Sequence, residues 1–223
     1  MEIQKEIQKK KESPSLFGMF TSPGIQFERI RENPKKWLPL TIVSILYAVG
    51  MFFMAATMDV QMLIDQGLTK EQAEIALGVT KITVVVTGVL TPVITILVSS
   101  VIQLLISKFG SSSVSFKQLF SMNTYIMIIG AVGVILNTAI RYAVGGNPEI
   151  YITSLAGLLN SEKAGVLGSI EVFSIWSTIL TAIGLHKTAG LSKGLAWTIA
   201  IIFFLVGIGF ALVGTALQGA PKL

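Results

Sequence analysis

Long apolar stretches recur along this chain of 223 residues, each close to the length that crosses a lipid bilayer. A helix needs about 20 consecutive apolar residues to span the hydrocarbon core. Inside that core the backbone polar groups must be satisfied within the segment, so stretches of this length indicate helices. We therefore predict an all-α polytopic membrane protein, a bundle of five transmembrane helices at about 38–58, 82–107, 117–140, 165–186 and 194–217.

Composition agrees with a membrane protein and excludes several classes of enzyme. Charged residues make up 13% of the chain and hydrophobic residues 52%, whereas soluble domains carry about 25% charged residues. The chain has no cysteine and one histidine, and it contains neither an HExxH zinc motif nor a phosphate-binding GxxxxGK[ST] loop. We predict no catalytic residue, no metal site and no cofactor.

The distribution of basic residues predicts the topology. Twelve of the 17 Lys and Arg residues precede the first stretch or flank the loops between stretches two and three and between four and five. Cytoplasmic loops carry the excess of Lys and Arg. We therefore expect a cytoplasmic N-terminus with a mobile tail over 1–15, an extracytoplasmic tail over 218–223, and a bacterial plasma membrane as the location. Basic residues beside membrane segments favour lipid headgroups over nucleic acid.

The segment before the first stretch mixes apolar and basic residues and predicts an amphipathic element at the membrane interface. Ser22 and Pro23 have the residue types of a helix N-cap and first turn. We expect Ile25, Phe27 and Ile30 to lie among lipid headgroups. The predicted contacts with lipid or a partner are made by Arg29, Arg31, Lys35, Lys36 and Trp37.

Polar and small residues form stripes inside the apolar stretches and predict how the helices pack. Residues three or four apart share a helix face, and small or hydroxylic residues let transmembrane helices approach closely. The second stretch carries a Thr, Ser or Gln at every fourth position from 83 to 107, and Pro92 predicts a kink there. The other stripes are Asn123, Gly130 and Asn137 in the third stretch, Gly168, Glu171, Ser174 and Thr178 in the fourth, and Gly207 and Ala211 in the fifth.

Glu171 is the one carboxylate within these stretches, and an intramembrane charge is usually paired or functional. Arg141 ends the third stretch on the same side of the membrane. If stretches three and four are antiparallel neighbours, the two residues reach similar depth. We predict a buried pair of Glu171 with Arg141, joined by Asn137; the alternative is a proton or cation relay at Glu171.

Three segments resemble the Yip family of membrane proteins. SPGIQFERIRENPKKWLPL is similar to the start of the family domain in Pro23, Phe27, Ile30, Pro34 and Pro39. EVFSIWSTILTAIGLHKTAGLSKGLAW is similar to the segment before the last span in Glu171, Phe173, Trp176, Gly184, Gly190 and Ala196. SFKQLFSMNTY resembles the entry to the third span. The resemblance implies a single five-helix domain over 16–217.

The function that we expect is helix–helix contact with other membrane proteins rather than catalysis. Eukaryotic members of the family are associated with small GTPases, a partner that is not expected here. Some bacterial members of similar size accompany an ABC-type exporter in defence against toxic peptides, so the resemblance implies an accessory or assembly role. The alternative is a small oligomeric transporter or channel that uses Glu171 and the Thr/Ser rows.

Overall fold

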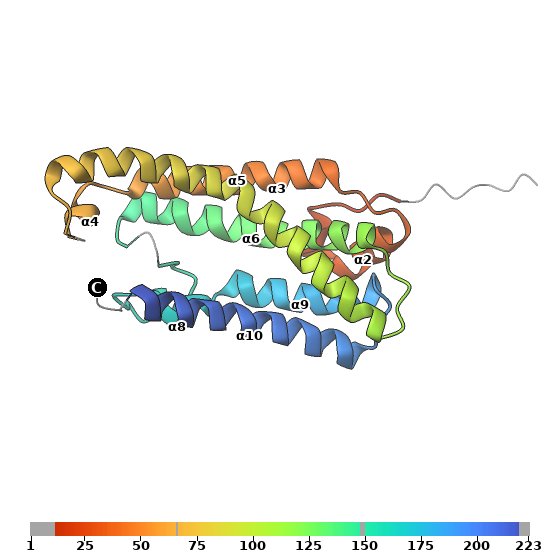
Figure 1. Ribbon diagram of the computed structural model, residues 1–223. Helices are drawn as coiled ribbons and strands as arrows, with labels where there is room; N and C mark the ends of the chain where they lie inside the picture. The colour runs from red at the N-terminus through yellow and green to blue at the C-terminus, as the bar shows by residue number, and fades with distance from the viewer. Residues whose placement is uncertain (1–11, 66, 148–149, 219–223) are drawn as a thin grey trace, which may run out of the picture.

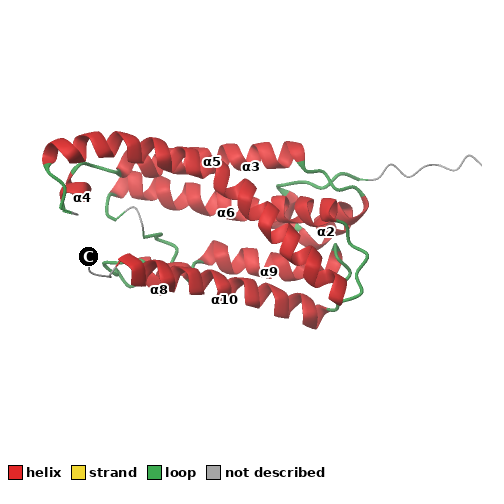
Figure 2. Ribbon diagram, in the orientation of Figure 1, coloured by secondary structure: helices red, strands yellow, loops and turns green. Residues whose placement is uncertain are grey.

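The computed structural model describes residues 12–65, 67–147 and 150–218, and this part of the chain is helical (Figures 1 and 2). The predicted tails over 1–15 and 218–223 lie almost wholly outside the described residues. In chain order the helices are α1 (Gly18–Thr21), α2 (Pro23–Glu32), α3 (Trp37–Thr57), α4 (Gln61–Ile64), α5 (Lys70–Phe109), α6 (Phe116–Val144), α7 (Leu155–Leu158), α8 (Gly165–Ser169), α9 (Val172–Lys187) and α10 (Lys193–Gln218).

Four described helices are long and apolar enough to cross a membrane, namely α3, α5, α6 and α10. Three of them begin within one residue of the predicted stretches. The exception is α5, which starts at Lys70 because Thr69 and Gln72 form a capping box there. Its 40 residues correspond to about 60 Å, so α5 is longer than the hydrocarbon core is thick. Pro92 lies within α5, and the helix changes direction in its middle (Figure 1).

The fourth predicted span is not one continuous helix, and this corrects the expectation of five uninterrupted spans. α8 ends at Ser169, the chain is extended at Glu171, and α9 begins at Val172. The 16 residues of α9 rise about 24 Å, less than the roughly 30 Å of the hydrocarbon core. The helix starts late because the Glu171 side chain occupies the cap position instead of a face in the middle of the helix.

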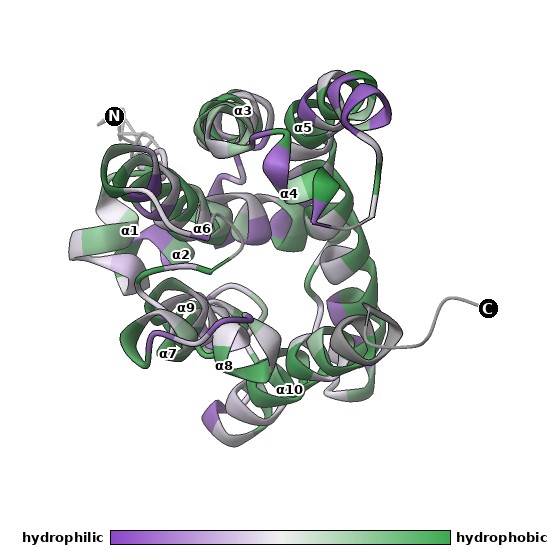
Figure 3. Cartoon of the chain, turned by 90° about the vertical axis from the view of Figure 1, so that its left-hand side faces the viewer, coloured by the Kyte–Doolittle hydropathy of each residue, from purple (hydrophilic) through white to green (hydrophobic). Residues whose placement is uncertain are grey.

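The long helices form two layers, which Figure 3 shows along the bundle from the α4 end. One layer contains α3, α5 and α6, and the other contains α8, α9 and α10. α6 is the most buried of the four long apolar helices, and it packs against both α3 and α9. α10 packs mainly against α9 and α8.

Two of the apolar residues predicted to lie among lipid headgroups, Phe27 and Ile30, lie inside the protein instead, which corrects that prediction, whereas Ile25 is exposed. α2 begins at Pro23 after Ser22, as predicted, and packs against α9 and α6. Phe27 and Ile30 are fully buried in the core with Met122 and Leu185. Apolar burial at this end therefore joins the two layers.

Side chains from later in the chain hold α2 and its following loop in place. Gln118 Nε2 donates to the carbonyl of Arg31 at 2.7 Å. Ser121 Oγ donates to the carbonyl of Lys35 at 2.5 Å, and Thr188 Oγ1 donates to the carbonyl of Phe27 at 2.9 Å. The bonds to Arg31 and Lys35 satisfy carbonyls at and beyond the end of α2 that no helical bond reaches.

Candidate functional site

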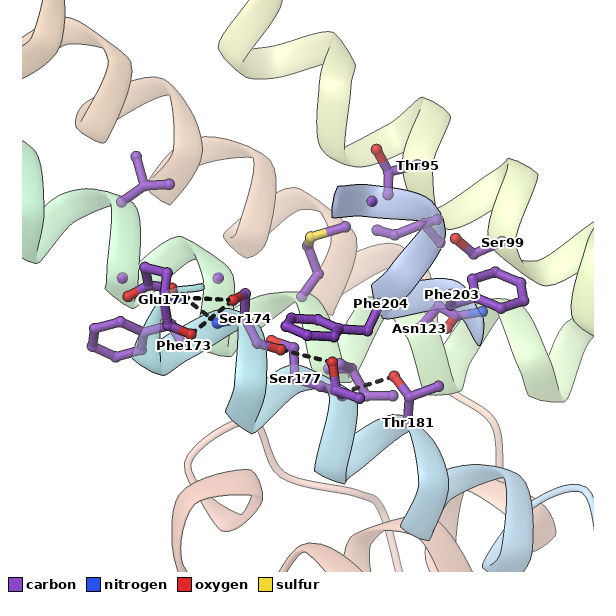
Figure 4. Close-up of a pocket in the computed structure, with 18 of the residues that line it drawn as sticks. Thr95, Ser99, Asn123, Glu171, Phe173, Ser174, Ser177, Thr181, Phe203 and Phe204 are labelled. Atoms are coloured by element: carbon purple, nitrogen blue, oxygen red, sulfur yellow. Dashed lines mark hydrogen bonds between the residues drawn. The ribbon is translucent and has the colours of Figure 1, made fainter. Parts of the chain in front are cut away.

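A cavity of about 620 Å³ lies between the two layers and is the candidate functional site (Figure 4). Its walls come from α3, α5, α6, α9 and α10, and Tyr151 of the loop after α6 also contributes. The polar stripes predicted in different stretches meet around it. Besides Glu171, Ser169 and the two tyrosines Tyr47 and Tyr151, the polar lining residues are Thr91, Thr95, Ser99 and Gln103 of α5, Asn123 of α6, and Ser174, Ser177, Thr178 and Thr181 of α9, with Gly130 and Gly207 beside them.

The hydroxyl groups on the two sides of the cavity differ in their bonding. On α9, Thr178 and Thr181 donate to the carbonyls of Ser174 and Ser177, one turn earlier. On α5, the side chains of Thr91, Thr95 and Ser99 make no hydrogen bond to any residue that the structure describes. The α5 wall therefore presents polar groups that are free to bind a molecule in the cavity.

Glu171 sits at the start of α9 on the cavity wall and is only 7% exposed. One carboxylate oxygen, Oε2, accepts from the backbone N–H of Ser174 at 2.9 Å, and Ser174 Oγ accepts from the N–H of Glu171 at 3.3 Å. This reciprocal arrangement is a capping box. The negative charge also lies favourably at the positive end of the helix dipole.

The break before Glu171 is closed by the loop that follows α6. The N–H of Leu155 donates to the carbonyl of Ile170 at 2.9 Å, and the N–H of Val172 donates to the carbonyl of Thr153 at 3.2 Å. Non-helical backbone at membrane depth is tolerated where protein groups satisfy it. These bonds meet that condition, and they place Thr153 beside the Glu171 carboxylate.

Asn137 and Glu171 are connected through Thr153. Asn137 Nδ2 donates to Thr153 Oγ1 at 2.7 Å and to the carbonyl of Gly133 at 2.9 Å, while Asn137 Oδ1 accepts from the Thr153 N–H at 3.1 Å. Thr153 Oγ1 lies 2.5 Å from Glu171 Oε1 and donates to it. Asn137 is fully buried, so this chain of bonds satisfies a buried amide completely.

Arg141 is not the partner of Glu171, which corrects the predicted ion pair. Its guanidinium donates to the carbonyl of Ile150 at 3.1 Å and to that of Gly145 at 3.4 Å. The ion pairs within the described ranges are Arg29–Glu12 and Lys187–Glu28. The loop after α6 folds back over the end of the helix, so Arg141 binds loop carbonyls while the loop hydroxyl of Thr153 reaches Glu171.

Asn123 binds α5 rather than the α9 stripe. Its amide Nδ2 donates to Ser100 Oγ at 2.9 Å and to Gln103 Oε1 at 2.8 Å. All three residues are buried. Asn123 therefore joins α5 to α6 next to the cavity.

Replacing Asn123 with leucine is expected to lower the free energy of unfolding by about 2 kcal/mol, because Gln103 Oε1 loses its donor while buried. The measurement is denaturant unfolding in detergent micelles. The matched control is Thr198→Leu, at an exposed threonine of α10 that bonds only within its own helix. Equal stability of the two variants would contradict the assignment.

The small residues predicted at helix contacts have different surroundings. A Cβ on Gly130 would lie 2.4 Å from Tyr47 Oη, so this glycine permits close contact of α6 with α3. A Cβ on Gly168 would meet Ala164 of its own turn, and one on Gly207 would meet nothing within 4 Å.

The basic residues proposed for lipid or partner contact lie around α2 at the end of the bundle where α3, α6 and α10 begin (Figure 1). Trp37 is 70% exposed, and Lys36 Nζ lies 4.8 Å from the centre of its ring. Arg29 pairs with Glu12. Lys35 contributes its carbonyl to Ser121, and Arg31 contributes its carbonyl to Gln118.

The cavity has an uneven distribution of charge. Glu171 is its one lining carboxylate, and the lining contains no Lys, Arg or His among the described residues. Burial and the neighbouring Glu171 carboxylate raise the pKa of Tyr151, which lies in the loop at the same end. No three His, Asp or Glu side chains in the described part of the chain are placed to share a metal ion.

The family model described as the Yip1 domain matches residues 17–214. "Membrane protein YknW" of Bacillus subtilis (strain 168) is 37% identical over 207 residues, which cover 90% of this chain and 90% of that protein. No solved structure gives a significant match.

Proposed function

The chain belongs to the Yip1-domain family of membrane proteins, and from this membership we propose that it is an accessory or assembly partner of a larger membrane complex. The family is not known for enzymes. The resemblance of this chain to bacterial members of the family favours subunits of an ABC-type exporter as the partner. We place the chain in a bacterial plasma membrane with the basic α2 end in the cytoplasm and the C-terminus outside, with α8 and α9 together making the fourth crossing.

The observation that carries the proposal is the contrast between glycines inside the bundle and those of α10. A Cβ on Gly50, Gly88 or Gly130 would lie within 2.5 Å of a side-chain atom on a neighbouring helix. A Cβ on Gly209, within the predicted fifth span, would meet no atom within 4 Å, and Gly209 does not line the cavity as Gly207 does. Glycine weakens a helix by about 1 kcal/mol and is enriched where transmembrane helices touch. This supports α10 as the helix that a partner covers.

Changing Gly209 to leucine is expected to abolish recovery of the partner complex, because the larger side chain keeps the partner helix away. The measurement is crosslinking in native membranes followed by affinity purification and mass spectrometry. The matched control is Gly78→Leu, at a glycine of α5 whose surroundings are equally open.

Stoichiometric recovery of exporter subunits with the original chain and with Gly78→Leu, but not with Gly209→Leu, would support docking through α10. Unchanged recovery with Gly209→Leu would reject α10 as the contact. A variant with Arg29, Arg31, Lys35 and Lys36 changed to glutamine tests the basic end separately. Its loss of recovery would place the contact on the cytoplasmic side.

Transport is the second candidate, and the cavity is the observation that favours it. The Thr/Ser rows and Glu171 line one space between spans, the arrangement that a small oligomeric carrier or channel needs. Two results together would favour transport over the accessory role. The chain would purify alone as a defined oligomer, and it would carry solute across liposome membranes in a flux that Glu171→Gln removes.

A further inference from the structure

We propose that the cavity between the two layers binds a small organic cation with an apolar body, with its charged group near Glu171. Three properties of the cavity lead to this ligand class: its size, its charge and its aromatic wall. The proposal concerns binding alone, so it holds for an accessory protein and for a carrier alike.

The size of the cavity fits a small molecule and not a partner helix. Its volume is about 620 Å³, within the range of roughly 300–1,000 Å³ that is usual for ligand pockets. A helix 30 Å long and 10–12 Å across occupies on the order of 2,500 Å³. A transmembrane helix of a partner therefore cannot be the occupant.

The charge of the cavity selects a cation. The Glu171 side chain is buried, with only 7% of its surface exposed. The described lining offers no basic side chain to neutralise its charge. An ionised carboxylate has about four acceptor positions. Two of them are used, by the Thr153 hydroxyl and the Ser174 N–H. Glu171 can therefore accept further hydrogen bonds from an ammonium group, in surroundings where water screens the attraction poorly.

The walls beyond Glu171 suit an apolar body. Phe173 lies beside Glu171, and Phe204 lies in the middle of the cavity between the Glu171 end and the Ser99 end (Figure 4). Aromatic faces attract cations as well as apolar groups. The unbonded hydroxyl groups of Thr95 and Ser99 on α5 lie at the other end of the cavity and are open to a further polar group of a ligand. A ligand with one positive charge and a compact hydrocarbon body matches the carboxylate and the aromatic walls.

The competing explanation is that Glu171 only caps α9 and accepts from the Thr153 hydroxyl. The residues that ordinarily cap a helix are Ser, Thr, Asp and Asn, and a neutral glutamine could make both contacts of Glu171. A charged side chain beside a polar cavity without a basic neighbour therefore exceeds what this structural role requires. The two explanations predict different results when the charge alone is removed, and that difference defines the test.

The experiment uses the full chain in lipid nanodiscs and equilibrium dialysis against three probes of one shape. The probes are 1-adamantylamine, a cation at pH 7, 1-adamantanol, which is neutral, and adamantane-1-carboxylate, an anion. Empty nanodiscs give the lipid background. We expect saturable binding of the amine at one site per chain, weaker binding of the alcohol and no saturable binding of the carboxylate.

Glu171→Gln is expected to weaken binding of the amine at least about tenfold and to leave binding of the alcohol unchanged. The matched control is Glu162→Gln, at an exposed carboxylate of the loop outside the cavity lining, which should bind all three probes like the original chain. Equal affinity for the three probes, or an unchanged affinity of Glu171→Gln for the amine, would overturn the proposal.

A second pair of variants keeps the test valid if Glu171→Gln does not fold. Aspartate and asparagine are both favoured N-caps, so Glu171→Asp and Glu171→Asn preserve the cap and differ in charge. The proposal is supported if Glu171→Asp binds the amine more tightly than the alcohol and Glu171→Asn does not. The same affinity for the amine in both variants refutes it.

Discussion

Glu171→Ala is expected to lower the free energy of unfolding by about 3 kcal/mol. The change removes the side-chain cap of α9, which is worth about 1 kcal/mol. It also removes the acceptor of the Thr153 hydroxyl, a charge-assisted bond worth about 2 kcal/mol. The loss extends beyond α9, because Thr153 belongs to the loop that closes the chain break and binds Asn137.

Glu171→Gln is the control for this change and should cost about 1 kcal/mol or less. Its side-chain oxygen can still accept from the Ser174 N–H. Its amide can donate to Thr153 Oγ1, whose hydrogen then turns to Asn137 Oδ1, 3.1 Å away. Every buried polar atom of the network keeps a partner, so no desolvation penalty is left uncompensated.

Both free energies can be measured by denaturant titration in micelles, with helix content as the signal. Equal losses for alanine and glutamine would contradict the network, because only alanine removes its bonds. No loss in either variant would mean that the Glu171 carboxylate has no structural role. A larger loss in Arg141→Ala than in Glu171→Ala would restore Arg141 as the main stabilising residue at this end.

Glu171 also marks the limit of what the sequence predicts. Apolar length correctly located the long helices because the bilayer sets that length. The capping boxes at Thr69 and at Glu171 are local signals, but a glutamate in an apolar stretch fits a helix interior as well as a helix start. Only the loop that pairs with Ile170 and Val172 makes the break favourable, and no periodicity within the stretch reveals that pairing.

The partner of Glu171 could not be predicted for a related reason. Charge complementarity pointed to Arg141, whereas the structure uses Thr153, a loop residue without a distinguishing pattern in the sequence. The buried position of α2 was missed because Phe27 and Ile30 suit a lipid interface and a protein core equally well. In contrast, residues of the predicted polar stripes in α5, α6 and α9 line the same cavity, as expected if these stripes face the inside of the bundle.

Gly133→Leu is expected to lower the free energy of unfolding by about 3 kcal/mol or more. A Cβ at this position would lie 2.7 Å from Phe173 Cγ and 2.9 Å from Phe173 Cβ. Phe173 is the second residue of α9, so its Cβ cannot move unless the start of the helix moves. That movement would pull Glu171 away from Thr153, and the steric cost would add to the loss of those hydrogen bonds.

Two further variants test whether the clash with Phe173 is the cause. Gly209→Leu adds the same side chain to an open position of α10 and should leave stability unchanged or raise it by up to about 1 kcal/mol. Phe173→Ala removes the Cγ and ring atoms of the clash but keeps Cβ, so the double variant should be more stable than the sum of the two single losses predicts without regaining full stability. Strict additivity would show that leucine at 133 disrupts something other than the α6–α9 contact. A favourable coupling would show that this glycine sets the distance between the two layers and thereby the width of the cavity.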